Sequence, residues 1–246
     1  MAGAAAERQE SGLIALINKS VKANKNNPIT IVSPNGTKIS GVTGAKKYTG
    51  RQITGSEPYT DVVLMIGKTK KLNVSMKGEE APSLAGGGLR GIELASPGLG
   101  AKYFKQAYAF LVKTKKLQPG DKVPDVYGKI PDNVVLDIIV GNESMGGPIN
   151  YMYVGPMTVT GRYDPKKNIL TVNGDFSPVK EYAKENKLYF RLRARREDQR
   201  FDPSAKDNKG VPKIYGRSPS RGDSAGRLVV VSEDSVPSTA SKIVIN

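Results

Sequence analysis

The apolar and polar positions of residues 3–23 repeat with the period of an α-helix. The apolar stripe of this segment consists of Leu13, Ile14, Ile17 and Val21. Residues at these spacings lie on one side of a helix, so the pattern predicts a helix that packs this stripe against a core. Three asparagines before Pro28 then predict the end of the helix.

Two predicted β-hairpins follow the helix. Residues 29–34 and 37–42 read as strands joined by a turn at Asn35-Gly36, a pair that favours tight hairpin turns. Residues 59–78 read as a second pair of short strands around a basic turn. Asp61 lies at the start of the first strand of this second hairpin, and Lys77 lies at the end of its second strand.

The pattern then changes from strands to a loop, a helix and a strand. Residues 79–98 are rich in glycine and are predicted to form a loop. Residues 99–116 are predicted to be a helix, and its inner face consists of Phe104, Ala107, Tyr108 and Leu111. The apolar run at 133–142 favours a buried strand. Residues 1–141 therefore predict a mixed α/β core.

The remaining residues, 142–246, predict a basic, β-rich region packed on that core. Strands are expected at 150–164, 168–176 and 188–196, with a short helix at 177–186. Residues 201–227 are rich in proline and glycine and are expected to be loops. The end of the chain, from 229, either adds a last strand or is irregular.

Composition limits the chemistry that this fold can carry. The chain of 246 residues has no cysteine and no histidine. Disulfides, thiolate metal sites, cysteine nucleophiles, histidine bases and histidine zinc sites are therefore excluded. Catalysis would have to use carboxylates, lysines, hydroxyl groups and hard cations.

The net charge of the chain indicates the kind of partner that it binds. The formal net charge is +15, which favours a polyanion, because lysine and arginine displace the counterions of phosphates. The alternative is a basic surface without a specific partner. No apolar run approaches the length of a membrane helix, and the N-terminus lacks the pattern of a signal peptide. We therefore expect an intracellular or virion protein that is neither secreted nor membrane-bound.

The second hairpin suggests a metal site. Strand side chains alternate, so Ser75 and Lys77 share one face, while Met76 points into the core and leaves its carbonyl group available. Without histidine, phosphodiester hydrolysis calls for Mg²⁺ or Mn²⁺, which lowers the pKa of an attacking water. Lys77 would position that water or offset charge in the transition state. The alternative for Asp61 and Lys77 is a surface ion pair or two unrelated solvated groups.

Glu10 is a further candidate ligand, because it falls in the middle of the apolar stripe of the first helix. A carboxylate among core residues is costly unless it is paired or binds a metal. Glu7 is a possible substitute. Alternatively, Glu10 remains solvated near the start of the helix, where its charge is favourable. Glu79 and Glu80 could add a carboxylate, but acids in such loops are more often solvated.

The arrangement of Asp61, Ser75 and Lys77 resembles the PD-(D/E)XK, or restriction-endonuclease-like, nuclease superfamily, and among its members the phage-encoded ones. In that family an Asp starts the second core strand, an acid-x-Lys motif follows on the third, and the first helix often adds a metal-binding Glu. The resemblance implies that Asp61 and Glu10 bind metal, and that Ser75 and the Met76 carbonyl complete its shell. Ser75 departs from the family by replacing the second acid.

A nucleic-acid interface is predicted beyond the core. Arg191, Arg193 and Arg195 alternate along one strand, at a spacing that suits a phosphate backbone. Further candidate contacts are Lys105, Arg217, Arg221 and Arg227. The alternative is a basic, solvated surface.

The sequence thus predicts a Mg²⁺-dependent DNA endonuclease, acting on double-stranded DNA and encoded by a phage. A non-enzymatic nucleic-acid-binding or virion structural protein on a degenerate nuclease fold is the alternative, with possible homodimer or virion assembly.

Overall fold

A computed structural model describes residues 3–51, 53, 57–79, 84, 88–224 and 226–245. The predicted mixed α/β class is confirmed, since these described residues form one sheet of eight strands and one of four, with helices. Two compact units share the chain. Met1–Ala81 and Ile139–Glu185 form unit 1, and Pro82–Ile138 and Asn186–Asn246 form unit 2. The chain crosses between the units three times, and one crossing, between Ile138 and Ile139, lies close to the expected boundary at residue 141.

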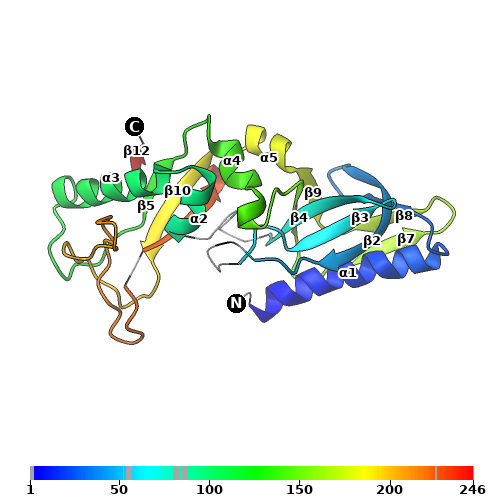
Figure 1. The fold of residues 1–246 in the computed structure, drawn as a ribbon, viewed down its shortest axis with the longest axis horizontal. Helices are drawn as coiled ribbons and strands as arrows, with labels where there is room; N and C mark the ends of the chain where they lie inside the picture. Colours follow the sequence, from blue (N-terminus) through cyan, green and yellow to red (C-terminus); the bar gives the residue numbers. More distant parts are fainter. Residues whose placement is uncertain are drawn as a thin grey trace. The chain divides into compact units, whose positions relative to one another are not determined.

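Unit 1 contains the eight-stranded sheet (Figure 1). Its strands are β1 (Ile29–Val32), β2 (Lys38–Lys47), β3 (Val62–Ile66), β4 (Lys70–Gly78), β6 (Tyr151–Gly155), β7 (Gly161–Asp164), β8 (Ile169–Val172) and β9 (Asp175–Pro178). They lie in the order β7-β8-β1-β2-β3-β4-β6-β9. Neighbours are antiparallel except at β1–β8 and β4–β6, which are parallel. Both predicted hairpins are confirmed.

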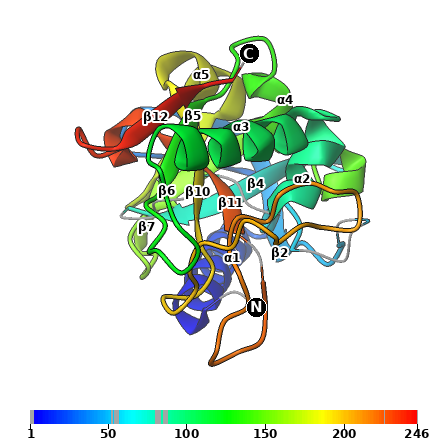
Figure 2. The same ribbon diagram turned by 90° about the vertical axis from the view of Figure 1, so that its left-hand side faces the viewer.

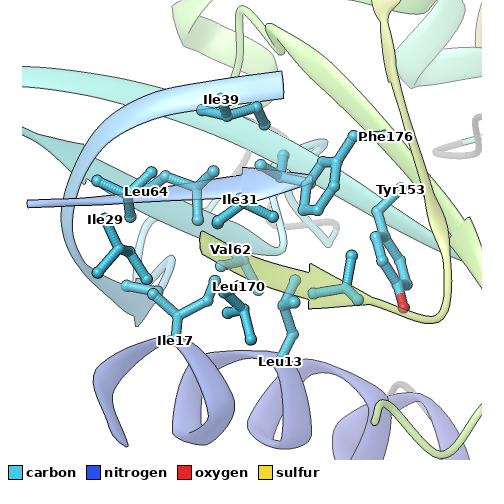
Figure 3. Close-up of a cluster of buried hydrophobic side chains, with 14 of the residues drawn as sticks. Leu13, Ile17, Ile29, Ile31, Ile39, Val62, Leu64, Tyr153, Leu170 and Phe176 are labelled. Atoms are coloured by element: carbon cyan, nitrogen blue, oxygen red, sulfur yellow. The ribbon is translucent and has the colours of Figure 1, made fainter. Parts of the chain in front are cut away.

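The predicted first helix is confirmed as α1 (Ala4–Ala23), which lies along one face of this sheet (Figure 1). Leu13 and Ile17 are fully buried, and they point toward strand residues such as Ile31 and Leu170 (Figure 3). Burying large aliphatic side chains of this kind stabilises the folded state by about 1.5–3 kcal/mol each. The apolar stripe read from the sequence is thus the contact that fixes α1 on the sheet.

Unit 2 contains the four-stranded sheet, in the order β11-β10-β5-β12. Its elements are α2 (Gly88–Ala95), α3 (Leu99–Lys113), β5 (Val126–Lys129), β10 (Leu188–Ala194), β11 (Gly226–Ser232) and β12 (Ser241–Val244). Figure 2 shows α3 in front of these strands. Tyr103 of α3 is buried against Phe190 and donates its hydroxyl hydrogen to the Val126 carbonyl at 2.6 Å.

Several sequence predictions were wrong. The apolar run at 133–142 contains a helix, α4 (Val135–Val140), in place of a strand. A short apolar run has no decisive periodicity, so its length could not distinguish the two. The predicted loop at 79–98 includes α2, and β5 was not predicted at all. The segment 150–164 is divided into β6 and β7.

The predicted short helix at 177–186 is present as α5 (Val179–Glu185). None of the helices within the described residues has the length and apolarity needed to cross a membrane.

Candidate functional site

The candidate site lies at the end of the eight-stranded sheet where β3 begins and β4 ends. The pairing of these strands stops at Val62 and Val74. Just beyond it, the Asp61 amide donates to the Val74 carbonyl at 2.9 Å. The last residues of β4 therefore have no partner on β3, and the Asp61 side chain takes up that position.

The Asp61 carboxylate is bound to β4 through one oxygen. Its Oδ2 accepts the Met76 amide hydrogen at 2.6 Å and the Ser75 hydroxyl at 3.3 Å. Because the N–H and C=O of one strand residue point to the same side, the Met76 carbonyl faces this edge as well. The Met76 side chain is buried in the core, as predicted. Oxygen atoms from Asp61 and Met76 are thus gathered at one strand edge.

Charge at this position is balanced by neighbours from other elements. Burial raises the pKa of Asp61, whereas the Lys77 ammonium and the Met76 amide lower it, and the Glu10 carboxylate raises it further. Glu10 of α1 and Lys77 at the end of β4 therefore each lie close enough to Asp61, at the start of β3, to act on its charge.

Glu10 is buried, as its place in the apolar stripe predicted. Its side chain is 8% exposed, and Oε2 lies 2.9 Å from Lys47 Nζ. Glu7, one turn earlier, is exposed. The alternative of a solvated Glu10 is wrong, and the residue is instead held as an ion pair.

Lys47 is a site residue that the sequence reading missed. Its pKa is raised by the hydrogen bond and charge of Glu10, and also by Glu7 and Asp61. The ammonium group thus lies among carboxylates at the end of β2. Ala45, two residues before Lys47, faces the core. Because side chains alternate along a strand, Lys47 lies on the same side of the sheet as Ala45 and α1.

Gln9 is a second missed residue, and it is only 2% exposed. Its Nε2 donates to the carbonyl oxygens of Lys77 at 3.2 Å, Gly155 at 2.8 Å and Pro156 at 3.2 Å. One buried amide therefore joins α1 to the ends of β4 and β6. Its position beside Glu10 gave no separate sequence signal.

The oxygen donors at this site suit a hard cation. Asp61, Glu10 and the Met76 carbonyl offer two carboxylates and one carbonyl, and Mg²⁺ commonly takes one or two carboxylates and completes its shell with water and phosphate. Within the described residues, no group of three or more acidic or other metal-binding side chains is arranged to hold a metal. Glu79 is exposed, and Glu80 lies outside the described residues.

The predicted arginine row is largely occupied by ion pairs. Arg191 and Arg193 belong to β10, whereas Arg195 follows its last residue. Arg191 donates through Nε and Nη2 to Asp125 Oδ2, at 2.8 and 2.6 Å. Arg195 Nε lies 3.3 Å from Asp223 Oδ2. Arg191 and Arg195 therefore have structural partners.

Arg193 and Arg227 differ from Arg191 and Arg195, which have carboxylate partners. They lie directly opposite each other on β10 and β11, and neither forms an ion pair with a carboxylate in the described part of the chain. Lys105, Arg217 and Arg221 are exposed, with the Nε of Arg217 donating to the Gly222 carbonyl at 3.1 Å. Two like charges side by side on a sheet repel each other, which makes this pair the better anion candidate of unit 2.

Comparisons with protein-family models, with curated proteins and with solved structures give no match for this chain.

Proposed function

We propose that the protein is a metal-dependent nuclease that hydrolyses phosphodiester bonds in DNA, with Mg²⁺ or Mn²⁺ as its cofactor. The supporting observation is that Glu10, Asp61 and Lys77, chosen for this chemistry from separate segments, lie at one end of one sheet. Structural packing alone does not require two carboxylates and a lysine to be gathered there.

Glu10, Asp61 and the Met76 carbonyl would hold the cation. When bound, the cation would polarise the phosphate and lower the pKa of a water molecule. Lys77 would orient that water or offset negative charge on the phosphate. Gln9 acts at a distance from the chemistry, because its bonds to the Lys77, Gly155 and Pro156 carbonyls fix the ends of β4 and β6.

Lys47 gives the site an internal counter-ion. Its ammonium neutralises the buried Glu10 carboxylate, which would otherwise be unpaired and costly. A divalent cation held by Glu10 would compete with Lys47 for the same oxygen. Lys47→Gln should therefore bind Mn²⁺ more tightly than the wild-type protein, by isothermal titration calorimetry.

Cleavage of plasmid DNA with Mg²⁺ or Mn²⁺, with and without EDTA, tests the main proposal. Wild-type protein should nick the plasmid only with free metal. Asp61→Ala should abolish cleavage and keep DNA binding, because its cationic surfaces are unchanged. Asp61→Asn is the second variant, since its amide oxygen can still accept the Met76 hydrogen bond and preserve the strand edge. Full cleavage by both variants would rule out the assigned role of Asp61.

The alternative is a non-enzymatic nucleic-acid-binding or virion structural protein, as the sequence also allowed. It is favoured by Ser75, which stands where nucleases of the PD-(D/E)XK superfamily have an acid, and by the hydrogen bonds that make Asp61 a cap for the strand edge. DNA binding without any metal-dependent cleavage, unchanged by either Asp61 substitution, would support it.

Ser75→Glu separates the two interpretations. Ser75 is buried next to Asp61, so a second carboxylate should destabilise the metal-free protein by like-charge repulsion. If a cation binds there, Mg²⁺ should raise the melting temperature of Ser75→Glu more than that of the wild type. The same shift in both proteins would mean that position 75 does not face a metal.

A further inference from the structure

The eight-stranded sheet has a second face, opposite the face that packs on α1. Strand side chains alternate, so residues next to the buried core positions point to this second side. It carries four exposed cations, Lys38, Lys46, Lys71 and Arg162. We call this side of the sheet the outer face.

The strand register arranges two of these cations in one row. Arg162 on β7 is opposite Thr171 on β8, Thr171 is beside Val32 on β1, and Val32 is opposite Lys38 on β2. Three steps between neighbouring strands span about 14 Å, at ~4.8 Å per step. One strand of duplex DNA places a phosphate about every 3.4 Å, so the row matches the length of a few phosphates.

The other two cations extend the outer face toward the candidate site. Lys46 on β2 is opposite Val63, and Lys71 on β4 is opposite Met65. Alternation along β4 then carries the same face from Lys71 to Ser75 and Lys77. The outer face and the candidate site therefore share one strand.

The positive charge on this face is not neutralised by ion pairs. None of the four cations pairs with a carboxylate in the described part of the chain. Asp164 faces the same side, but its Oδ1 accepts the backbone hydrogens of Lys166 and Lys167 in its own turn. This differs from Arg191 and Arg195, whose charges are bound to Asp125 and Asp223.

The polar groups between the cations suit phosphate oxygens. Thr171 is exposed, and Thr30 donates its hydroxyl hydrogen to Ser40 on the neighbouring strand at 3.3 Å. The strongly exposed apolar side chains of the described residues, Ile53, Val112, Leu136, Met157 and Val244, all lie elsewhere. A lipid surface or an apolar protein partner would use such side chains, whereas a nucleic-acid backbone needs cations and hydroxyl groups.

We infer that the outer face of the eight-stranded sheet binds the phosphate backbone of DNA through Lys38, Lys46, Lys71 and Arg162. The choice of DNA rests on the proposed function, but binding at this face does not require cleavage. Contacts of this kind neutralise phosphates without reading bases, so binding is independent of DNA sequence.

The test replaces Lys38, Lys71 and Arg162 by glutamine together. The control replaces Lys19, Lys22 and Lys25, three exposed lysines on or just after α1, and lowers the net charge by the same amount. Affinity for two unrelated DNA duplexes is measured by fluorescence anisotropy at several NaCl concentrations, with EDTA present to prevent cleavage. Circular dichroism checks that both variants are folded.

The outer-face variant should bind both duplexes at least tenfold more weakly at low salt. Its log–log salt slope should fall by about 0.9 for each phosphate that the variant no longer neutralises. The control should stay within about twofold of the wild type, since its cations lie off the path of the DNA. Equal losses in both variants, an unchanged slope, or no DNA binding by the wild type would overturn the inference. Binding to anionic vesicles but not to DNA would overturn it as well.

The result is separable from the nuclease proposal. If Asp61→Ala binds DNA like the wild type and loses that binding with the outer-face substitutions, the inference stands even when no protein cleaves the plasmid. If the outer-face variant binds and cleaves like the wild type, the inference fails and the nuclease proposal remains.

Discussion

Asp61 has two roles: its carboxylate accepts hydrogen bonds from β4, and in the proposed function it binds the metal. Its burial favours the protonated carboxyl, while Lys77 and the Met76 amide favour the charged form. The outcome is a pKa above the ordinary 3.8. The carboxylate is therefore retained at a cost in stability, which is typical of functional positions more than of ones selected for packing.

This cost predicts an unusual pH dependence. As pH rises from 3.8 toward the raised pKa of Asp61, the unfolded chain releases the proton before the folded protein does. The contribution of Asp61 to stability therefore falls across that window. Asp61→Asn does not titrate, so its stability relative to the wild type should increase with pH there, in metal-free urea titrations.

Asp198 provides a control of opposite sign. Hydrogen bonds from Ser220 and Ser218 lower the pKa of Asp198 below 3.8. Its stabilising contribution is present above that value and is lost as pH falls toward the lowered pKa. Asp198→Asn should therefore become less stable, relative to the wild type, as pH rises. The same trend in both variants would contradict the assignment of Asp61.

Site residues were predictable where one strong rule applied. Glu10 was found because an acid interrupts an apolar helical stripe, and Asp61 and Lys77 because they end the strands of a clear hairpin. Lys47 and Gln9 were missed because their roles depend on α1 lying across the sheet. Ion pairs of Arg191 and Arg195 were also missed, since their partners Asp125 and Asp223 come from distant segments.

At the scale of elements, β10 and β11 place two kinds of arginine on one surface. Arg191 is bound to Asp125 and its side chain is 19% exposed. Arg227 is opposite Arg193 and is exposed. The same substitution should therefore have opposite effects at the two positions.

Arg227→Gln should raise the free energy of unfolding by about 0.2–1 kcal/mol, because it removes a repulsive cross-strand pair. It should also weaken DNA binding if Arg193 and Arg227 contact phosphate. Arg191→Gln should lower the free energy of unfolding, because Asp125 Oδ2 loses the guanidinium that donates two hydrogen bonds to it. Urea titration of both variants, combined with anisotropy on one duplex, checks the two signs. Stabilisation by Arg191→Gln would show that its ion pair contributes nothing.

Elements themselves were predicted where the periodicity was long. α1 and α3 have several turns of regular spacing, and both hairpins have clear turn residues. The prediction failed at 133–142 and for β5, where a few apolar residues fit either a helix or a strand. Burial in the folded protein, which local periodicity does not report, accompanies both segments: Val126, Ile138 and Ile139 are almost completely buried.

On the scale of the whole molecule, each unit contains a cluster of buried hydrophobic residues. One cluster includes Leu13, Ile17 and the strands of the eight-stranded sheet, and another includes Tyr127, Tyr189 and Val229. The expected single boundary at residue 141 lies near one of three crossings between the units, the one between Ile138 and Ile139, but misses the crossings near 81 and 185. The glycine-rich sequence that begins at residue 79 coincides with the first crossing and was interpreted only as a loop. The local pattern of apolar and polar residues does not predict where the chain passes from one compact unit to the other.

Clusters of buried residues in different units predict that a mutation in one unit leaves the other unit unchanged. Leu13 is fully buried, so Leu13→Ala should destabilise unit 1 by about 2–5 kcal/mol. Hydrogen exchange should accelerate for amides of β2 and β3 and stay unchanged for β10 and β11. Equal acceleration in both units would mean that they unfold together.

The parallel pairing of β4 with β6 also has a consequence for synthesis of the chain. β4 ends at Gly78, and its parallel neighbour begins at Tyr151, so more than seventy residues leave the ribosome before that edge is covered. At roughly 5–20 residues per second, the nascent β4 waits on the order of 4 to 14 s. During this interval its open edge could pair with another chain. Lys70, Lys71 and Lys77 place three positive charges on this strand, and lysines on an open edge strand disfavour pairing with a second copy.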